Sequence, residues 1–186
     1  MDTKETLRQF EETVRGYIRD LESSSLERLL WKPSEDEWSL GQMYMHLIRS
    51  AQFMQLRNAA LCLEPGESTE VSQAGKTKAG EEVFKAGSFP PDRVHVPPSP
   101  QYTPPQPESK GQLAEGLRET LRRMEEIESR ITAELDSGKE AAPYTVLHPR
   151  FGGLNALEWF RLTEMHYRHH LLQKGRLDDA WREAHG

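Results

Sequence analysis

The chain has 186 residues, 35% of them hydrophobic and 29% charged, and a net charge of −6 with histidine neutral. These values suit a single domain, residues 1–186, with a packed core beneath a highly polar surface. They argue against nucleic-acid binding, which requires a basic face, and no run of Lys and Arg supplies one. No window approaches 18 apolar residues and the charged N-terminus has no apolar signal segment, so we expect a cytoplasmic protein without membrane contact.

Two amphipathic helices are predicted in the first third of the chain. Over residues 7–21, apolar side chains recur every three or four positions and form one stripe. This helix ends before the polar loop "WKPSEDEW". The second helix begins after Ser39, because Ser39 and Gln42 have the spacing of a capping box, and it ends near Leu63, before a Pro-Gly pair.

Cys62, in the apolar stretch "NAALCL" of this second helix, is the only cysteine of the chain. An intrachain disulfide and a cysteine-based metal site are therefore excluded. Its apolar surroundings favour a buried structural thiol rather than a nucleophile.

The connection that follows, from about Gly66 to Gly111, has an unusual composition. Its segment "FPPDRVHVPPSPQYTPPQP" holds eight of the twelve prolines of the chain. Helix interiors and central strands reject such a density of proline. A low-complexity linker is one interpretation. Interspersed aromatic and aliphatic residues favour the other, an extended excursion that packs along the rest of the protein.

Two further helices are predicted in the second half. Residues 113–135 carry a leucine-rich stripe of helical period. The last helix begins at Asn155, for which Glu158 is the return partner of a capping box. We expect this helix to continue to about Gln173 and to stop at Gly175.

Three histidines fall within five positions of the last helix. His166 and His170 are four residues apart, so they project from the same face one turn apart, the arrangement that holds metals in HExxH motifs. His169 points about 100° away from His170 and could pair with His166 instead. For an isolated pair, a solvated polar face is the simpler interpretation. However, His46 lies alone in the apolar stripe of the second helix, and three inward-facing histidines need a common partner to offset their desolvation.

The positions of these histidines constrain the topology. His46 lies about 10 Å from the start of its helix at 1.5 Å per residue, whereas His166 and His170 lie toward the C-terminal end of theirs. The three meet at one level only if the second and fourth helices are antiparallel. An up-down-up-down bundle would make them parallel, but a long connection can return the chain along the bundle. We therefore predict an all-α four-helix bundle with a long crossover between helices two and three.

The stretches "WSLGQMYMHLIRSAQFM" and "HPRFGGLNALEWFRLTEMHYRHHLLQ" resemble the DinB-like superfamily of metalloenzymes. The resemblance spans the whole chain, and it is greatest to the branch that also supplies the N-terminal domain of ergothioneine sulfoxide synthases. It implies a four-helix bundle, often a homodimer, that binds Zn, Ni or Fe through three histidines. Matching motif positions makes His46, His166 and His170 the ligands. The sulfoxide synthases carry a Glu where this chain has Leu172, and this chain lacks their second domain, which argues against that activity.

The resemblance also points to a reaction class. Three neutral imidazoles leave coordination positions open, as in catalytic zinc sites. Similar proteins include bacillithiol and mycothiol S-transferases, which implies a metal that binds a low-molecular-weight thiol, lowers its pKa and presents it to an electrophile. The alternatives are hydrolysis by a metal-bound hydroxide and a non-catalytic metal-binding or interaction module. Glu164 lies on the wrong face and Glu158 is engaged in capping, so no carboxylate is placed as a general base, which favours thiol transfer.

The remaining polar residues have more modest expected roles. His148 precedes the last helix and is expected to hydrogen-bond structurally, and His95 approaches the site only if the proline-rich excursion folds over it. His169 is expected at the rim. Gln173 either supports the ring of His170 or is a plain helix-end residue. Arg168 either recognises an anion or is solvated.

Overall fold

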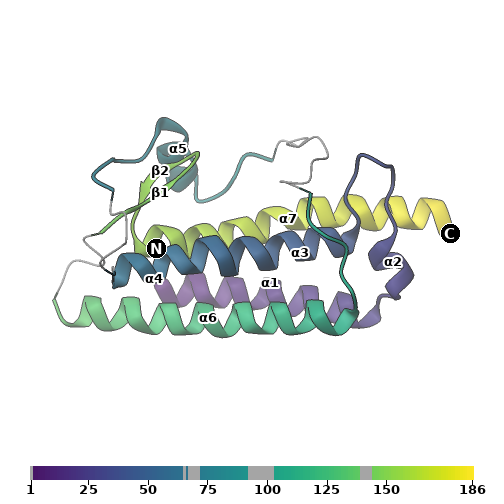
Figure 1. Ribbon diagram of the computed structural model, residues 1–186, viewed down its shortest axis with the longest axis horizontal. Helices are drawn as coiled ribbons and strands as arrows, with labels where there is room; N and C mark the ends of the chain where they lie inside the picture. Colours follow the sequence, from purple (N-terminus) through teal and green to yellow (C-terminus); the bar gives the residue numbers. More distant parts are fainter. Residues whose placement is uncertain (1, 65, 67–71, 92–102, 139–143) are drawn as a thin grey trace.

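The computed structural model shows an all-α bundle, with a small two-stranded sheet in the part of the chain that it describes (Figure 1). The described residues are 2–64, 66, 72–91, 103–138 and 144–186. The helices and strands are, in chain order, α1 (Thr3–Ser23), α2 (Leu26–Leu30), α3 (Leu40–Ser50), the π-helix η1 (Ala51–Gln55), α4 (Leu56–Leu63), α5 (Lys78–Ala86), α6 (Lys110–Asp136), β1 (Val146–His148), β2 (Gly152–Leu154) and α7 (Ala156–His185). Among these helices, none combines the length and the apolar character of a membrane-spanning segment.

The four bundle helices have the predicted topology. In Figure 1, α1 and α7 run in one direction, while α6 and the continuous helix α3–η1–α4 run in the other. The chain between α4 and α6 therefore returns along the length of the bundle, which is the expected crossover. As a result α3 and α7 lie antiparallel and in contact, the arrangement that the histidine spacing requires.

Side-chain caps set the starts of the two helices that carry the histidines. The Ser39 side chain accepts a hydrogen bond from the Gln42 amide, and the Gln42 side chain accepts one from the Ser39 amide. Asn155 and Glu158 form the same reciprocal pair at the start of α7. Both predicted capping boxes are confirmed, and each satisfies amide groups that the first turn of a helix leaves without partners.

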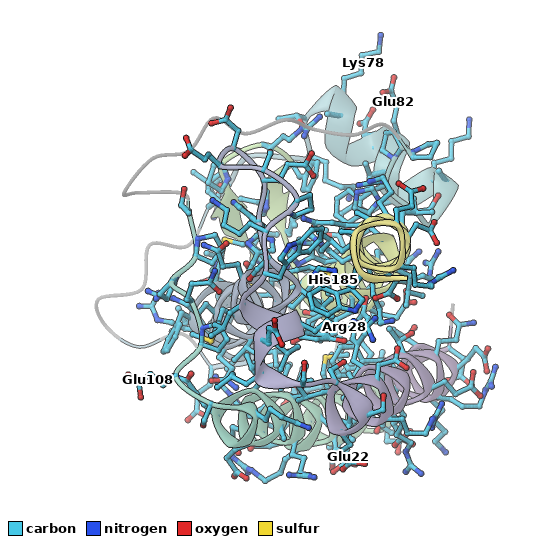
Figure 2. All side chains as sticks on the ribbon, turned by 90° about the vertical axis from the view of Figure 1, so that its right-hand side faces the viewer. Glu22, Arg28, Lys78, Glu82, Glu108 and His185 are labelled. Carbon is cyan, nitrogen blue, oxygen red and sulfur yellow. The ribbon has the colours of Figure 1, made fainter. Side chains whose placement is uncertain are left out.

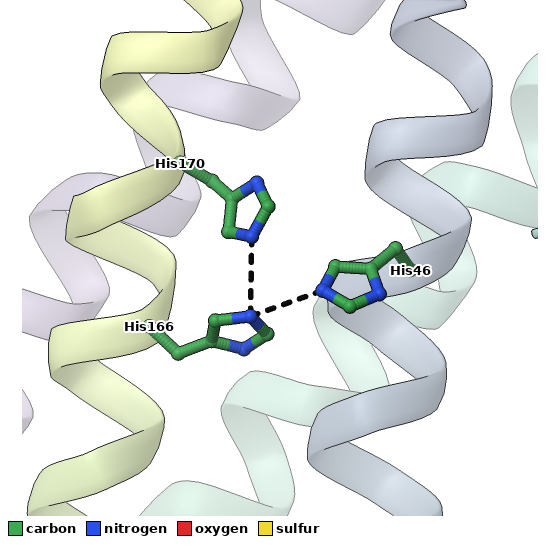
Figure 3. A group of neighbouring side chains, drawn as sticks. All are labelled: His46, His166 and His170. Atoms are coloured by element: carbon green, nitrogen blue, oxygen red, sulfur yellow. Dashed lines mark hydrogen bonds between the residues drawn. The ribbon is translucent and has the colours of Figure 1, made fainter. Parts of the chain in front are cut away.

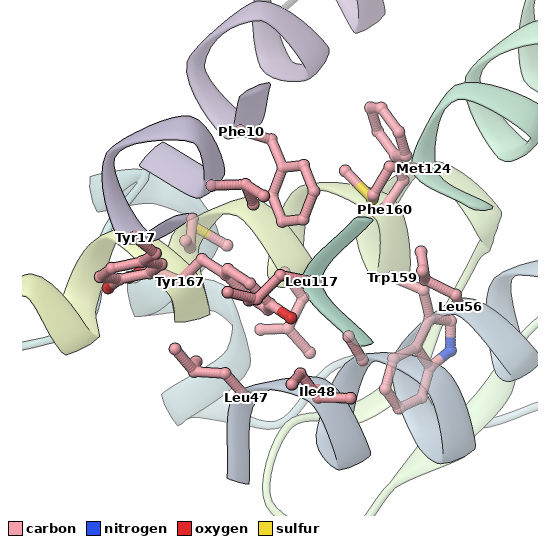
Figure 4. Close-up of a cluster of buried hydrophobic side chains, with 14 of the residues drawn as sticks. Phe10, Tyr17, Leu47, Ile48, Leu56, Leu117, Met124, Trp159, Phe160 and Tyr167 are labelled. Carbon is pink, nitrogen blue, oxygen red and sulfur yellow. The ribbon is translucent and has the colours of Figure 1, made fainter. Parts of the chain in front are cut away.

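The core is a layer of aromatic and aliphatic side chains between the four helices (Figure 4). Phe10, Tyr17, Trp159 and Tyr167 are fully buried, and the rings of Phe10 and Tyr167 lie 4.8 Å apart. The Tyr17 hydroxyl donates to the Tyr167 carbonyl at 2.7 Å, which ties α1 to α7 beside the site. Cys62 is buried as predicted. Burial of such aromatic residues contributes about 1.5–3 kcal/mol each, so the core holds the histidine-bearing helices in a fixed relation.

Short elements in the connections were not predicted. Helix α5 forms within the excursion, and the hairpin β1–β2 precedes α7. The two dock on each other, because the Thr77 hydroxyl donates to the Arg150 carbonyl at 2.9 Å and the Gly153 amide to the Gly75 carbonyl at 3.1 Å. The far end of the excursion packs as expected, since the Gln42 side chain donates to the Pro104 carbonyl. His95 lies outside the described residues.

The predicted end of the last helix is wrong. Helix α7 continues through Gly175 for ten more residues, to His185. Tertiary contacts support this extension: the Trp181 ring lies 5.5 Å from that of Trp31, and Asp178 pairs with Arg28. The His185 ring stacks on Trp181 at 3.6 Å, and Figure 2 views this end of the bundle. A glycine lowers helix propensity by only about 1 kcal/mol, which these contacts offset.

A pair of glycine substitutions tests the docking of the hairpin. A Cβ at Gly153 would lie 2.1 Å from the Ala74 carbonyl oxygen, whereas one at Gly175 meets nothing within 4 Å. Gly153→Ala is therefore expected to destabilise the protein by about 1–3 kcal/mol, because backbone must move. Gly175→Ala is expected to stabilise it by about 0.5–1 kcal/mol. Denaturant unfolding measures both, and equal midpoints for Gly153→Ala and the wild type would contradict the close approach.

Candidate metal centre

Three histidine rings converge between α3 and α7 (Figure 3). The Nε2 atom of His166 lies 3.0 Å from Nε2 of His46 and 3.1 Å from Nε2 of His170. One ligand atom from each residue lies within 4.8 Å of the others. The predicted convergence of the rings is therefore confirmed. Their role as metal ligands is a separate step and stays a prediction.

The outward nitrogen of each ring also has a polar neighbour. Nδ1 of His170 lies 2.8 Å from Oε1 of Gln173, and Nδ1 of His46 lies 3.5 Å from the Ser50 hydroxyl. An amide oxygen only accepts hydrogen bonds, so His170 carries its proton on Nδ1 and presents a lone pair on Nε2. Gln173 thus has the supporting role that was one of its two predicted interpretations. Such contacts fix the ring orientation of metal-binding histidines.

His166 is supported by Gln55, which lies in the π-helix. The Gln55 side-chain amide lies 3.1 Å from Nδ1 of His166, and only 3% of the residue is exposed. His46 lies nine residues before Gln55, so in an uninterrupted α-helix the two side chains would point about 180° apart around the axis. The wider turn of η1, in which the Leu56 amide donates to the Ala51 carbonyl, changes the direction of Gln55. Hydrophobic periodicity does not predict this contact, because it assumes a regular helix.

Residues 6–173 match the family model of the DinB superfamily.

The chain belongs to the DinB superfamily. The matched span runs from α1 into α7 and includes His46, His166 and His170. The match is to the superfamily as a whole, so the expected relation to the sulfoxide-synthase branch stays a prediction. No curated protein and no solved structure matches the chain.

Burial keeps the three histidines of this DinB protein uncharged. It lowers the pKa of His46 to about 4, and burial together with the nearby His46 lowers the pKa of His170 to about 3. The pKa of His166 falls well below its usual value, first through burial and then through the neighbouring rings. Neutral imidazoles have free lone pairs, so the cluster is ready to bind a cation at neutral pH.

These lowered pKa values predict acid sensitivity of the metal-free DinB protein. An unfolded histidine takes up a proton near pH 6.5, whereas folded His46 stays neutral to about pH 4. The contribution of one such residue to the free energy of unfolding is therefore fully present above pH 6.5. It is lost as the pH falls toward 4, by on the order of 1 kcal/mol at pH 5.5. Denaturant unfolding of His46→Gln is expected to show a weaker loss of stability on acidification than the wild type. Parallel curves for the two proteins would contradict the prediction.

Neither of the two carboxylates that α7 carries near the histidines, Glu158 and Glu164, is free to act on the cluster. Glu158 completes the cap of α7 and pairs with Lys76. Glu164, which the sequence places on the face away from the histidines, is only 2% exposed and accepts hydrogen bonds from Arg168 at 2.7 and 3.0 Å. Arg168 also donates to the carbonyl of Gly87 at 2.8 Å, so this pair anchors the end of α5 to α7 instead of recognising an anion.

A cavity of about 830 Å³ opens onto the histidine cluster. Aromatic side chains from three segments form its walls: the Trp38 ring lies 5.1 Å from that of His46, the Phe89 ring 6.2 Å from that of His166, and Phe151 comes from the hairpin. Within the part of the chain that the structure describes, the lining consists of Asp36, Glu37, Trp38, His46, Ala79, Glu82, Val83, Ala86, Ser88, Phe89, Pro90, Pro91, Arg150, Phe151, His166, His169, His170, Leu172, Gln173, Arg176 and Leu177. The excursion and the hairpin thus enclose the site from the side opposite the bundle core.

The other two described histidines near the site behave as expected. His169 lines the cavity but is not part of the converging group, which agrees with a position at the rim. His148 accepts hydrogen bonds at Nδ1 from the amides of Arg150 and Phe151, at 3.0 and 3.2 Å. It therefore shapes the hairpin turn that carries Phe151 into the cavity wall.

Proposed function

We propose that this DinB-superfamily protein is a metal-dependent enzyme and that His46, His166 and His170 hold a divalent ion, which is Zn, Ni or Fe. The reaction proposed is transfer of a low-molecular-weight thiol to an electrophile. The observation that supports the proposal most directly is the convergence of three neutral imidazoles at the inner end of a large cavity. A site with three protein ligands leaves room for a substrate atom, as in catalytic zinc enzymes.

The spacing of the nitrogens fits a metal. Two imidazole nitrogens bound tetrahedrally at about 2.0–2.1 Å lie roughly 3.3 Å from each other. The two Nε2 pairs measured here, at 3.0 and 3.1 Å, are within a few tenths of an ångström of that value. The donor set is also suitable, because imidazole is a good ligand for Zn, Ni and Fe.

The residues around the cluster support thiol transfer over hydrolysis. A bound divalent ion would lower the pKa of a thiol and keep it as the nucleophilic thiolate at neutral pH. The chain would then need only to orient the two substrates and to exclude water, which the walls formed by Trp38 and Phe89 favour. Hydrolysis gains from a general base, but Glu158 and Glu164, which lie on the same helix as His166 and His170, are engaged in ion pairs with Lys76 and Arg168.

Metal analysis and a thiol-dependence assay test the proposal. Protein purified without a histidine tag is expected to contain about one metal ion per chain. An electrophile such as monobromobimane is expected to be consumed faster than in the enzyme-free control only when a small thiol is added. Turnover without thiol would favour the hydrolase, and absence of stoichiometric metal would favour a non-catalytic interaction module.

A further inference from the structure

The described lining of the cavity contains two cationic side chains that the proposed function has not used, Arg150 and Arg176. Arg150 packs over the Phe151 ring, with Cζ 5.9 Å from the ring centroid. Arg176 lines the cavity and lies on α7 six residues after His170. Within the described residues it has no ion-pair partner, unlike Arg182 on the same helix, which pairs with Asp179 at 2.9 Å. An arginine that lines a cavity without a carboxylate partner can bind an anionic group of a ligand through two parallel hydrogen bonds.

Helix geometry limits the distance between this charge and the histidines. Six residues of α-helix rise about 9 Å, which is the axial separation of the Cα atoms of His170 and Arg176. Helical side chains lean toward the N-terminus, so the long side chain of Arg176, which lines the same cavity as His170, leans toward the histidine end of that cavity.

The acidic groups of the cavity lining do not neutralise Arg176. Glu82 pairs with Lys78, and Figure 2 shows both side chains projecting outward from α5. Glu37 takes part in an interaction of its own, and Asp36 is exposed on the loop before α3. Arg176 is itself exposed, so it supplies a positive charge on the solvent-facing side of the cavity that contains the histidines.

The volume of the cavity favours a ligand of more than a few atoms. A volume of about 830 Å³ lies in the upper part of the range for sites that bind drug-sized molecules. The lining includes apolar side chains, among them Trp38, Phe89 and Leu177. A fitting ligand thus has a reactive atom at one end, an apolar or extended body, and an anionic group several bonds away.

We propose that Arg176 binds a carboxylate of the thiol substrate, so that the protein selects low-molecular-weight thiols with a carboxylate roughly 6–9 Å from the sulfur, the span that the helix rise sets. This inference rests on the proposed function, because it assumes that the sulfur lies at the three histidines. The inference goes beyond the proposed function because it names Arg176 as the residue that discriminates between thiols and a carboxylate as the group that Arg176 recognises.

A matched pair of thiols tests the inference on the full-length protein loaded with Co²⁺. The pair is 6-mercaptohexanoate and 6-mercaptohexanol, which differ in the distal group and have nearly the same thiol acidity. Binding is followed through the charge-transfer absorption that a thiolate gives on Co²⁺. The wild type is expected to bind the carboxylate about 10–100-fold more tightly, as a charge-assisted hydrogen bond provides.

Two arginine variants test whether Arg176 causes the preference for the carboxylate thiol. Arg176→Gln is expected to bring the affinity ratio close to one while the Co²⁺ content stays the same. Arg182→Gln, which changes an exposed arginine on the same helix, is expected to keep the ratio of the wild type. Equal affinities in the wild type, or a preference that survives in Arg176→Gln, would overturn the inference and leave the proposed function standing. If neither thiol gives the absorption band, the proposed function fails and the inference fails with it.

Discussion

Replacement of His46, His166 or His170 by alanine is expected to abolish stoichiometric metal uptake, whereas His169→Ala is expected to retain it. Three-coordinate binding depends on every ligand, because the free energy of binding is shared among few bonds. Structural zinc sites bind with about 10–16 kcal/mol, so the loss of one ligand of three weakens binding by roughly 10³-fold. Metal content after equilibration in a buffered metal solution measures the effect.

His169→Ala is a close control for these variants. Its ring lies 5.8 Å from that of His170 and lines the same cavity, yet it is not part of the converging group. If substitution merely disturbed α7, His169→Ala would lower metal uptake as much as His166→Ala and His170→Ala do, whereas a defined coordination site separates His169 from the other two. Stoichiometric binding by any of the three ligand variants, with the fold intact by circular dichroism, would refute the assignment.

The architecture could be predicted because two independent features of the sequence agree. The i, i+4 spacing of His166 and His170 and the isolated position of His46 require antiparallel helices, and the long proline-rich connection permits them. The caps at Ser39 and Asn155 set the starts of both helices, and each involves only local hydrogen bonds. Local interactions of this kind are visible in the sequence without knowledge of the fold.

The elements that escaped prediction depend on distant partners. Helix α5 has only nine residues and is held by α7 through the contact of Arg168 with Gly87. Isolated helices of this length are marginal in water, so their periodicity is a weak signal. The extension of α7 depends on Trp31 and Arg28, which lie about 150 residues away in the chain. Because the sequence predicts a stop at Gly175, Arg176 falls beyond the predicted helix.

The supporting shell of the site could be predicted only in part. Gln173 is three residues from His170 on one helix, so its contact follows from spacing. Gln55 could not be found in this way, because a regular helix would turn it away from His46. One signal was present: after Ser50 the apolar stripe could continue through either Phe53 or Met54. Phe53 is 67% exposed, so the regular stripe breaks at the π-helix.

Substitution of Gln55 is expected to have the second largest effect on metal binding. When His166 binds a metal through Nε2, its Nδ1 carries a proton and needs an acceptor. In the structure the Gln55 amide nitrogen faces Nδ1, while Oε1 is buried without a partner, so a half-turn of the amide group supplies the acceptor. Gln55→Leu removes it and is expected to weaken metal affinity by about 10–100-fold. Gln55→Glu keeps an acceptor oxygen and is expected to retain affinity close to that of the wild type.

Competition with a chromophoric chelator measures these affinities, and Gln52→Leu provides the matched control. Gln52 lies in the same π-helix, but its side chain donates to the Gly116 carbonyl and the Thr120 hydroxyl on α6 and does not reach the histidines. Gln52→Leu is therefore expected to lower the free energy of unfolding and to leave metal affinity unchanged. If Gln55→Leu binds metal as tightly as the wild type, or if Gln52→Leu weakens binding equally, the π-helix serves packing alone. A selective loss at Gln55, restored by glutamate, would show that the irregular turn is retained because it gives His166 its acceptor.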